Sequence, residues 1–337
     1  MASIDIFSIQ PHQVSRDLRG YSIFLYGGWK TGKTTIAAKF PKALLLAFEK
    51  GYSAIPGIMA LPLESWSDFK RTLRQLKDPR AKELYETVII DTADIAYDLC
   101  TKYICANNNA DSVSDIPYGK GYGMIEKEFD DALRSIVQMN YGLVIISHDT
   151  DKVFTNENKE QYNKIVPTLD KRANNICARM CDIIGYSRAV EDANGNLVTK
   201  LFMRGTPRYE AGSRFKYTPD VIDFTYQNLV NAIADAIDKQ MEEDGAELFT
   251  NSRDNLHNTA TVLDFDELMN KFNSIIDIIV ASASEEEMVK NWTPRIQQIT
   301  DRYLGKGNKV GNMNRDQVEA LSLIVDDLEE LAKNVAL

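Results

Sequence analysis

The residues best suited to chemistry lie in one glycine-rich stretch near the amino terminus. Residues 27–34 read Gly-Gly-Trp-Lys-Thr-Gly-Lys-Thr and fit the spacing G-x-x-x-x-G-K-[ST] without a mismatch. In such a loop, glycine lets backbone N–H groups turn towards phosphate oxygens, lysine places a positive charge on the β- and γ-phosphates, and the threonine hydroxyl can bind Mg²⁺. The spacing therefore predicts a site for ATP and Mg²⁺. The residues expected to form it are Gly27, Gly28, Trp29, Lys30, Thr31, Gly32, Lys33, Thr34 and Thr35.

The flanking sequence predicts the elements that position this loop. Residues 22–26 form a short apolar run of strand type, and residues 35–40 can continue a helix, whose positive dipole end would face the phosphates. Three more continuous apolar runs follow at 43–48, 87–91 and 142–147. Continuous runs are typical of strands covered on both faces. Helices expected at about 65–76 and 122–138 alternate with them, which predicts an α/β fold with a mainly parallel, doubly wound sheet.

Each of these strands ends in polar residues. Glu49 follows the second strand, Asp91 ends the third, and Ser147 and His148 end the fourth. The carboxyl ends of parallel strands meet at one edge of a sheet, so we expect these side chains to converge on the nucleotide. Asp91 would hold Mg²⁺ with Thr34, Glu49 would orient or deprotonate the attacking water, and His148 would sense the γ-phosphate.

Each of these three residues also has an ordinary structural interpretation. Asp91 could cap the next helix, Glu49 could be a solvated loop residue, and His148 could be a satisfied structural histidine.

The sequence after residue 148 is less regular. Residues 149–167 are polar and aperiodic, which predicts a long exposed loop with a modest excess of positive charge. A helix near 169–181 and an antiparallel hairpin of 183–189 with 198–204 are expected next. The loop-like segment 204–216 carries several cations, either as a solvated face or to reach a phosphate of a neighbouring subunit. The candidates for that role in trans are Arg208, Arg214 and Lys216.

Charge separates the carboxyl-terminal part of the chain from the rest. The net charge is −10, and residues 238–337 hold twenty of the Asp and Glu residues against ten Lys and Arg, whereas residues 1–237 hold twenty-nine of each. We expect a nucleotide-binding domain over 1–241, a linker over 242–261 and an acidic helical module over 262–337, with amphipathic helices near 264–281, 285–303 and 314–335.

The composition indicates the compartment. No apolar run approaches the ~20 residues that span a bilayer, and residues 1–14 do not resemble a signal peptide, so we expect a cytoplasmic protein with no membrane partner.

The chain has four cysteines, Cys100, Cys105, Cys177 and Cys181, and their spacing is not that of a zinc finger. We expect buried reduced thiols, and a site made of four thiolates is the alternative.

Taken together, residues 15–237 resemble the phage-encoded RecA-like ATPases, including AAA-domain nucleotide-binding proteins and single-strand annealing or recombination proteins of the Sak type. The resemblance is carried by residues 27–34, 46–52, 88–92, 118–122, 146–149 and 207–215. It implies that Glu49 activates water and that Ser147 and His148 couple the γ-phosphate to a DNA-binding loop over 149–167. It also implies a head-to-tail homo-oligomer with the nucleotide between subunits, acting in the host cytosol. The carboxyl-terminal module has no counterpart in the family.

The leading hypothesis is an ATP hydrolase directed to single-stranded DNA in annealing, recombination or replication. Aromatic rings could stack on bases and lysines could contact phosphates. The candidate residues are Tyr118, Tyr122 and Tyr162 with Lys120, Lys152, Lys159 and Lys164.

Three alternatives stay open. A nucleotide-gated interaction protein would recruit replication partners, a single-strand-binding protein among them, without contacting DNA itself. A small-molecule kinase would need an arginine-rich lid and a second pocket, and the sequence indicates neither. A GTPase is disfavoured because Asn163-Lys164-Ile165-Val166 lacks the final Asp of a guanine-reading N-K-x-D motif.

Overall fold

The computed structural model describes residues 11–155, 157–251 and 263–333. The chain divides into two compact units, and the described residues up to 251 and those from 263 onward fall in different units.

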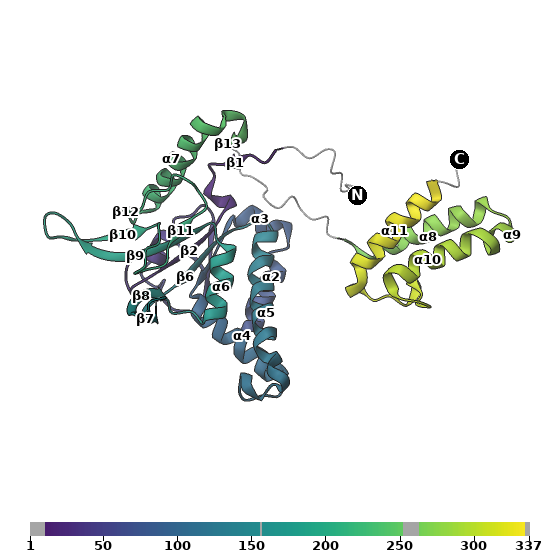
Figure 1. The fold of residues 1–337 in the computed structure, drawn as a ribbon, viewed down its shortest axis with the longest axis horizontal. Coiled ribbons are helices and arrows are strands. Elements are labelled where there is room, and N and C mark those ends of the chain that lie inside the picture. The colour runs from purple at the N-terminus through teal and green to yellow at the C-terminus, as the bar shows by residue number, and fades with distance from the viewer. Residues whose placement is uncertain (1–10, 156, 252–262, 334–337) are drawn as a thin grey trace. The chain divides into compact units, whose positions relative to one another are not determined.

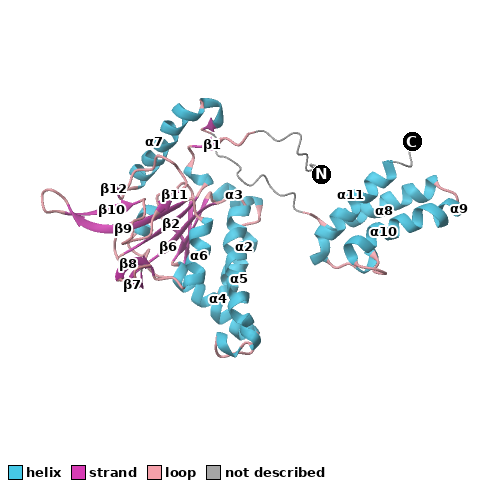
Figure 2. Ribbon diagram, viewed as in Figure 1, coloured by secondary structure: helices cyan, strands magenta, loops and turns pink. Residues whose placement is uncertain are grey.

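The amino-terminal unit is built on a nine-stranded sheet in the order β12-β10-β9-β2-β6-β5-β3-β4, with β11 beside β9 (Figures 1 and 2). Six neighbouring strands, β4, β3, β5, β6, β2 and β9, run parallel to one another. Strands β10, β11 and β12 are added by antiparallel pairing. This confirms the predicted mainly parallel α/β fold. The strands are β2 (Ser22–Gly27), β3 (Ala43–Ala47), β4 (Met59–Pro62), β5 (Thr87–Asp91), β6 (Gly142–Ser147), β9 (Ile183–Glu191), β10 (Leu197–Phe202), β11 (Gly212–Ser213) and β12 (Val221–Asp223).

Helices cover both faces of this sheet (Figure 1). Alternate residues of β2 enter different cores: Phe24 and Tyr26 belong to one cluster, Ile23 and Leu25 to the other. The first cluster includes residues of α2 (Trp66–Gln75), α4 (Ala93–Asn107), α5 (Lys120–Gln138) and α6 (Lys171–Met180); the second includes residues of α1 (Lys33–Ala37) and α7 (Tyr226–Asp244). Burial on both faces explains why the central strands read as continuous apolar runs.

Local sequence signals set several helix ends. The Ser65 hydroxyl accepts a hydrogen bond from the Asp68 backbone N–H at 3.1 Å, so Ser65 caps the start of α2, the helix expected at about 65–76. Thr225 caps α7 in the same way. Shorter helical turns occur at α3 (Pro79–Leu84), η1 (Leu18–Gly20), η2 (Val113–Asp115) and η3 (Pro117–Gly119).

Residues 149–167 form a hairpin rather than the expected irregular loop. Strand β7 (Asp149–Thr155) pairs with β8 (Gln161–Pro167), and Asp149 lies opposite Pro167. The aromatic pair Phe154 and Tyr162 faces across the two strands with ring centroids 6.0 Å apart. Most other side chains of both strands are polar, so no apolar alternation in the sequence indicates them.

The core extends into the stretch expected to be linker. Helix α7 continues to Asp244, and β13 (Phe249–Thr250), which follows η4 (Ala246–Leu248), pairs in parallel with β1 (Val14–Ser15). Phe249 is buried against the apolar cluster that holds α7. The rest of that stretch, from residue 252, lies outside the described residues.

The carboxyl-terminal unit is a helical module with its own core, as the amphipathic stretches predicted. Ile279, Leu321 and Ile324 are fully buried at its centre. Its elements are α8 (Phe265–Ser282), α9 (Glu285–Glu287), the π-helical turn η5 (Met288–Trp292), α10 (Thr293–Leu304), η6 (Val310–Asn312), η7 (Arg315–Gln317) and α11 (Val318–Lys333). Across the described part of the chain, no helix has the length and apolar character needed to cross a membrane.

Candidate functional site

The phosphate loop turns between β2 and α1, and two of its glycines are required by geometry. Gly27 has φ 149°, and a Cβ atom there would lie 2.1 Å from the Ser187 carbonyl oxygen on β9. Gly32 has φ 87°, a left-handed conformation that immediately precedes α1. The Thr31 hydroxyl lies 2.9 Å from the Ser187 hydroxyl, so β9 supports the loop from the side.

Lys33 fills the loop with its own ammonium group. The side chain is only 6% exposed, and Nζ donates hydrogen bonds to the carbonyl oxygens of Gly27 at 2.7 Å and Gly28 at 2.8 Å. Burial lowers the pKa of Lys33, and the nearby carboxylates of Asp149 and Asp91 oppose that shift. Anionic oxygens entering the loop would give this buried cation the charge partner that the two neutral carbonyls do not supply.

Thr34 and Asp91 form the oxygen pair expected to hold Mg²⁺. The Thr34 hydroxyl donates to Asp91 Oδ2 at 2.6 Å, which joins the start of α1 to the end of β5. Asp91 is buried, and desolvation raises its pKa. The Thr34 hydrogen bond opposes this shift without reversing it. Hydroxyl and carboxylate oxygens are the ligands that Mg²⁺ prefers, so these two residues fit that ion.

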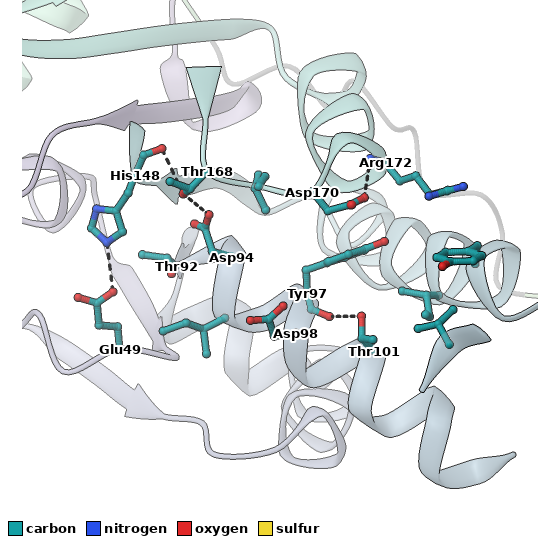
Figure 3. Close-up of a pocket in the computed structure, with 15 residues that line it drawn as sticks. Glu49, Thr92, Asp94, Tyr97, Asp98, Thr101, His148, Thr168, Asp170 and Arg172 are labelled. Atoms are coloured by element: carbon teal, nitrogen blue, oxygen red, sulfur yellow. Dashed lines mark hydrogen bonds and ion pairs between the residues drawn. The ribbon is translucent and has the colours of Figure 1, made fainter. Parts of the chain in front are cut away.

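Glu49 and His148 face each other at the same edge of the sheet. Glu49 Oε2 and His148 Nε2 are 3.3 Å apart, and Figure 3 shows both side chains pointing into the space between their strands. The Glu49 backbone N–H donates to the Asp91 carbonyl at 3.1 Å, so the position of Glu49 is tied to the end of β5. The Trp29 ring lies edge-on to the His148 ring at 6.2 Å and is 80% exposed.

These residues line one cavity of about 620 Å³ at the carboxyl edge of the parallel strands. The sequence predicted this convergence from the four strand ends. Its lining is Trp29, Lys30, Thr31, Gly32, Lys33, Thr34, Thr35, Glu49, Gly51, Asp91, Ile146 and His148. Ser187 supports the loop and Asp149 lies close to it, and neither was predicted as a site residue. Asp149 could have been found from its position next to His148, whereas Ser187 depends on β9 pairing with β2 and leaves no local signal.

A second cavity of about 450 Å³ shares part of its lining with the first, and Figure 3 shows the residues that line it. Glu49 and His148 belong to the lining of both. The sequence did not indicate this second pocket, because it forms where α4, α5 and α6 pack together. The lining residues are Glu49, Thr92, Asp94, Ile95, Tyr97, Asp98, Thr101, Val113, Tyr122, Ile125, His148, Thr168, Leu169, Asp170 and Arg172.

The aromatic candidates for nucleic-acid contact lie in different settings. Tyr118 is 94% exposed, with Lys120 Nζ 5.8 Å from its ring centre. Tyr122 instead lines the second cavity, where the Arg172 guanidinium lies 4.6 Å from its ring centre. Tyr162 is partly exposed on β8.

The β7–β8 hairpin is not a basic surface. Lys152 and Lys159 are exposed, but Lys164 pairs with Glu210 at 3.1 Å. Residues 149–167 contain three lysines against four acidic residues, so their formal charge is −1 and the expected positive excess is wrong. The four acidic residues are Asp149, Asp151, Glu157 and Glu160.

None of the three cations proposed to act in trans lines the phosphate-loop cavity. Arg214 pairs with Asp182 at 3.0 Å, and Lys216 pairs with Glu243 at 2.6 Å. Arg208 is exposed and lines a separate cavity beside the β7–β8 hairpin.

Comparison with known proteins agrees with this geometry. The sequence profile of the family described as "AAA domain" matches residues 19–215, which include the phosphate loop, Glu49, Asp91 and His148. The chain is also 30% identical over 337 residues to the SPbeta prophage-derived uncharacterized protein YorG of Bacillus subtilis (strain 168), a similarity that covers 98% of this chain and 99% of that protein. The phosphate loop, the strand ends that converge on it and these two matches together show that the chain belongs to the AAA domain family of P-loop proteins.

Proposed function

We propose that this protein hydrolyses ATP, with Mg²⁺ held by Thr34 and Asp91 and with Glu49 as the general base. One observation carries the proposal: a carboxylate, Glu49, lines the same cavity as Lys33 and the Thr34–Asp91 pair. A lysine and two magnesium ligands are the groups that bind a triphosphate, and a carboxylate in the same cavity is suited to take a proton from water.

The chemistry follows from these positions. Glu49 accepts a proton from a water molecule, the water oxygen bonds to the γ-phosphorus, and the bond from that phosphorus to the β–γ bridging oxygen breaks. Lys33 offsets the negative charge on the phosphate oxygens, and the loop N–H groups hold them in place. Bound Mg²⁺ would further neutralise the β- and γ-phosphate oxygens. His148, 3.3 Å from Glu49, orients that carboxylate as a positioning residue.

The direct test is steady-state hydrolysis of ATP by the purified chain with and without Mg²⁺. We expect turnover that requires Mg²⁺ and disappears in Lys33→Ala, because Lys33 places its ammonium group among the carbonyl oxygens of the loop. Lys39→Ala is the matched control, since Lys39 is exposed and follows the same helix. An intact turnover in Lys33→Ala would contradict the proposal.

We further propose that hydrolysis serves a role on single-stranded DNA, in annealing, recombination or replication. Support comes from the position of the β7–β8 hairpin, which begins at Asp149, directly after His148, and so joins the nucleotide cavity to an exposed element. Exposed Tyr118 and Lys120 add an aromatic ring and a charge suited to a single strand. The prophage origin of the relative agrees with a phage protein that acts in the host cytoplasm.

The DNA proposal has its own test. Single-stranded DNA should raise the rate of ATP hydrolysis at low salt, and Tyr118→Ala should weaken that stimulation while leaving hydrolysis without DNA unchanged. Hydrolysis that DNA never alters would favour the alternative of a nucleotide-gated interaction protein.

Assembly into a homo-oligomer, with Arg208 as the candidate cation in trans, is part of the same proposal. Rescue of ATP hydrolysis on mixing Arg208→Ala protein with Glu49→Gln protein tests it.

A further inference from the structure

We propose that the second cavity, enclosed by α4, α5 and α6 beside the phosphate loop, binds an organic cation: a guanidinium or ammonium group carried on an apolar body. The cavity, of about 450 Å³, falls in the size range of sites for small organic ligands. The inference concerns a ligand other than the nucleotide and does not require that the chain hydrolyse ATP.

The charge of the walls indicates the sign of the ligand. Asp94 and Asp98 lie one helical turn apart on α4, Asp170 lies just before α6, and Glu49 closes the side next to the phosphate loop (Figure 3). The cationic side chain in the lining is Arg172, whose guanidinium lies against Tyr122. Four carboxylates against one guanidinium leave an excess of negative charge, which favours a positively charged occupant.

Two buried oxygen atoms in the walls lack partners among the described residues. Thr92 is only 1% exposed, and its hydroxyl has no hydrogen-bond partner there. Asp94 Oδ1 accepts hydrogen bonds from the Ser147 hydroxyl at 3.1 Å and from the Thr168 hydroxyl, whereas Asp94 Oδ2 is buried and unpartnered. Buried polar atoms are normally satisfied, so these two acceptors point to an N–H donor supplied by a ligand.

The remaining walls suit an apolar body. Ile95, Tyr97, Ile125 and Leu169 line the cavity between the carboxylates. Tyr97 and Tyr122 also offer aromatic rings, which attract guanidinium and ammonium groups.

A metal ion does not match this arrangement. Among the residues that the structure describes, no group of three or more His, Cys, Asp or Glu side chains is placed to hold one. The carboxylates are distributed around the cavity and do not converge on one point (Figure 3). Separated acceptors fit a ligand whose N–H donors are themselves separated, as they are in a guanidinium group.

The position of the cavity predicts coupling to the nucleotide. Because Glu49 and His148 line both cavities, a cation in one lies close to the triphosphate in the other. A cation in the second cavity and a triphosphate in the first attract each other, so each favours the binding of the other. This coupling must be reciprocal.

The test uses two probes of the same shape, n-butylguanidinium and the neutral n-butylurea, titrated calorimetrically into the nucleotide-free full chain. We expect n-butylguanidinium to bind at least tenfold more tightly than n-butylurea. Asp98→Asn should weaken n-butylguanidinium binding at least threefold, and Thr92→Val should weaken it as well. Asp131→Asn is the matched control, because Asp131 is an exposed acid on α5 that does not line the cavity. Asp98 is exposed at the rim, so its substitution should leave folding intact.

Equal affinities for the two probes, no binding of either, or an equal loss in Asp131→Asn would overturn the proposal. None of these results depends on ATP hydrolysis, so failure here and failure of the proposed function are distinguishable. The cation could be a free molecule or a basic side chain of a second copy. If saturating n-butylguanidinium lowers the native mass of an assembly, a side chain from another subunit is the source; an unchanged mass indicates a free ligand.

Discussion

At the scale of single residues, the site is organised around a buried cation, the ammonium group of Lys33. Lys33 is held by two backbone carbonyls of its own loop, and burial lowers its pKa. Neutral carbonyls compensate a buried ammonium less well than phosphate oxygens do. The buried Lys33 ammonium therefore lowers the stability of the nucleotide-free protein at the position where the nucleotide binds.

The pH dependence of stability tests this cost. The unfolded chain releases the Lys33 proton near 10.5, but the folded chain releases it at lower pH. As pH rises towards 10.5, the unfolded state holds more protons at Lys33 than the folded state does. This residue therefore makes the free energy of unfolding rise with pH. We therefore expect Lys33→Met to be more stable than wild type near pH 7, with that advantage shrinking towards pH 10.

Urea unfolding of the nucleotide-free proteins at several pH values measures the difference. Lys39→Met is the control, since Lys39 is exposed. A Lys33→Met advantage that grows with pH would contradict the interpretation of Lys33 as a destabilising buried charge.

At the scale of elements, the central strands position the site, and they were also the most predictable part of the chain. Continuous apolar runs located β2, β3, β5 and β6, and the parallel arrangement then placed the residues at their ends together. In the register of the sheet, Tyr26 lies opposite Ser147, and Ile146 opposite Asp91, so the strand ends are level.

Features that depend on long-range packing were not predictable in the same way. Ser187 supports the phosphate loop only because β9 pairs with β2. The second cavity exists only because α4, α5 and α6 meet there, and the β7–β8 hairpin shows no clear apolar alternation. In each case the signal lies in contacts between distant residues, and no local run of sequence carries it.

The central position of β2 predicts a large packing effect. Leu25 is fully buried between β6 and β9, so Leu25→Ala should lower the free energy of unfolding by about 2–5 kcal/mol through the lost transfer energy and the cavity left behind. Leu197→Ala, at an exposed position of β10, should change it by less than about 0.5 kcal/mol. Similar losses in the two variants, measured by chemical denaturation, would show that β2 is not the centre of the core.

At the scale of the whole molecule, the nucleotide site and the acidic excess belong to different units. The site residues lie before residue 252, whereas the carboxyl-terminal helices hold most of the excess Asp and Glu. Acidic residues repel nucleic acid at low salt, so this module is poorly suited to be a DNA-docking surface.

A chain ending at residue 251 should test that separation. It keeps β13 and its pairing with β1, so we expect it to fold and to bind nucleotide like the full chain. At low salt it should bind single-stranded DNA more tightly than the full chain, with the difference shrinking as salt shortens the Debye length towards ~8 Å. If a folded, nucleotide-binding truncation bound DNA more weakly, the DNA contacts would belong to the helical module instead.

The central claim is that Glu49 is the base of an ATP hydrolase, and Glu49→Gln tests it most directly. The amide keeps the size of the side chain but cannot take a proton, so Mg-ATP affinity should stay within about threefold while turnover falls by about 10²–10⁴. Glu64→Gln, at an exposed position outside the cavity, is the matched control. Equilibrium binding of ATP measured beside single-turnover hydrolysis on the same preparations gives both quantities. Retained affinity with lost turnover is the predicted result; hydrolysis by Glu49→Gln at the wild-type rate would contradict the account.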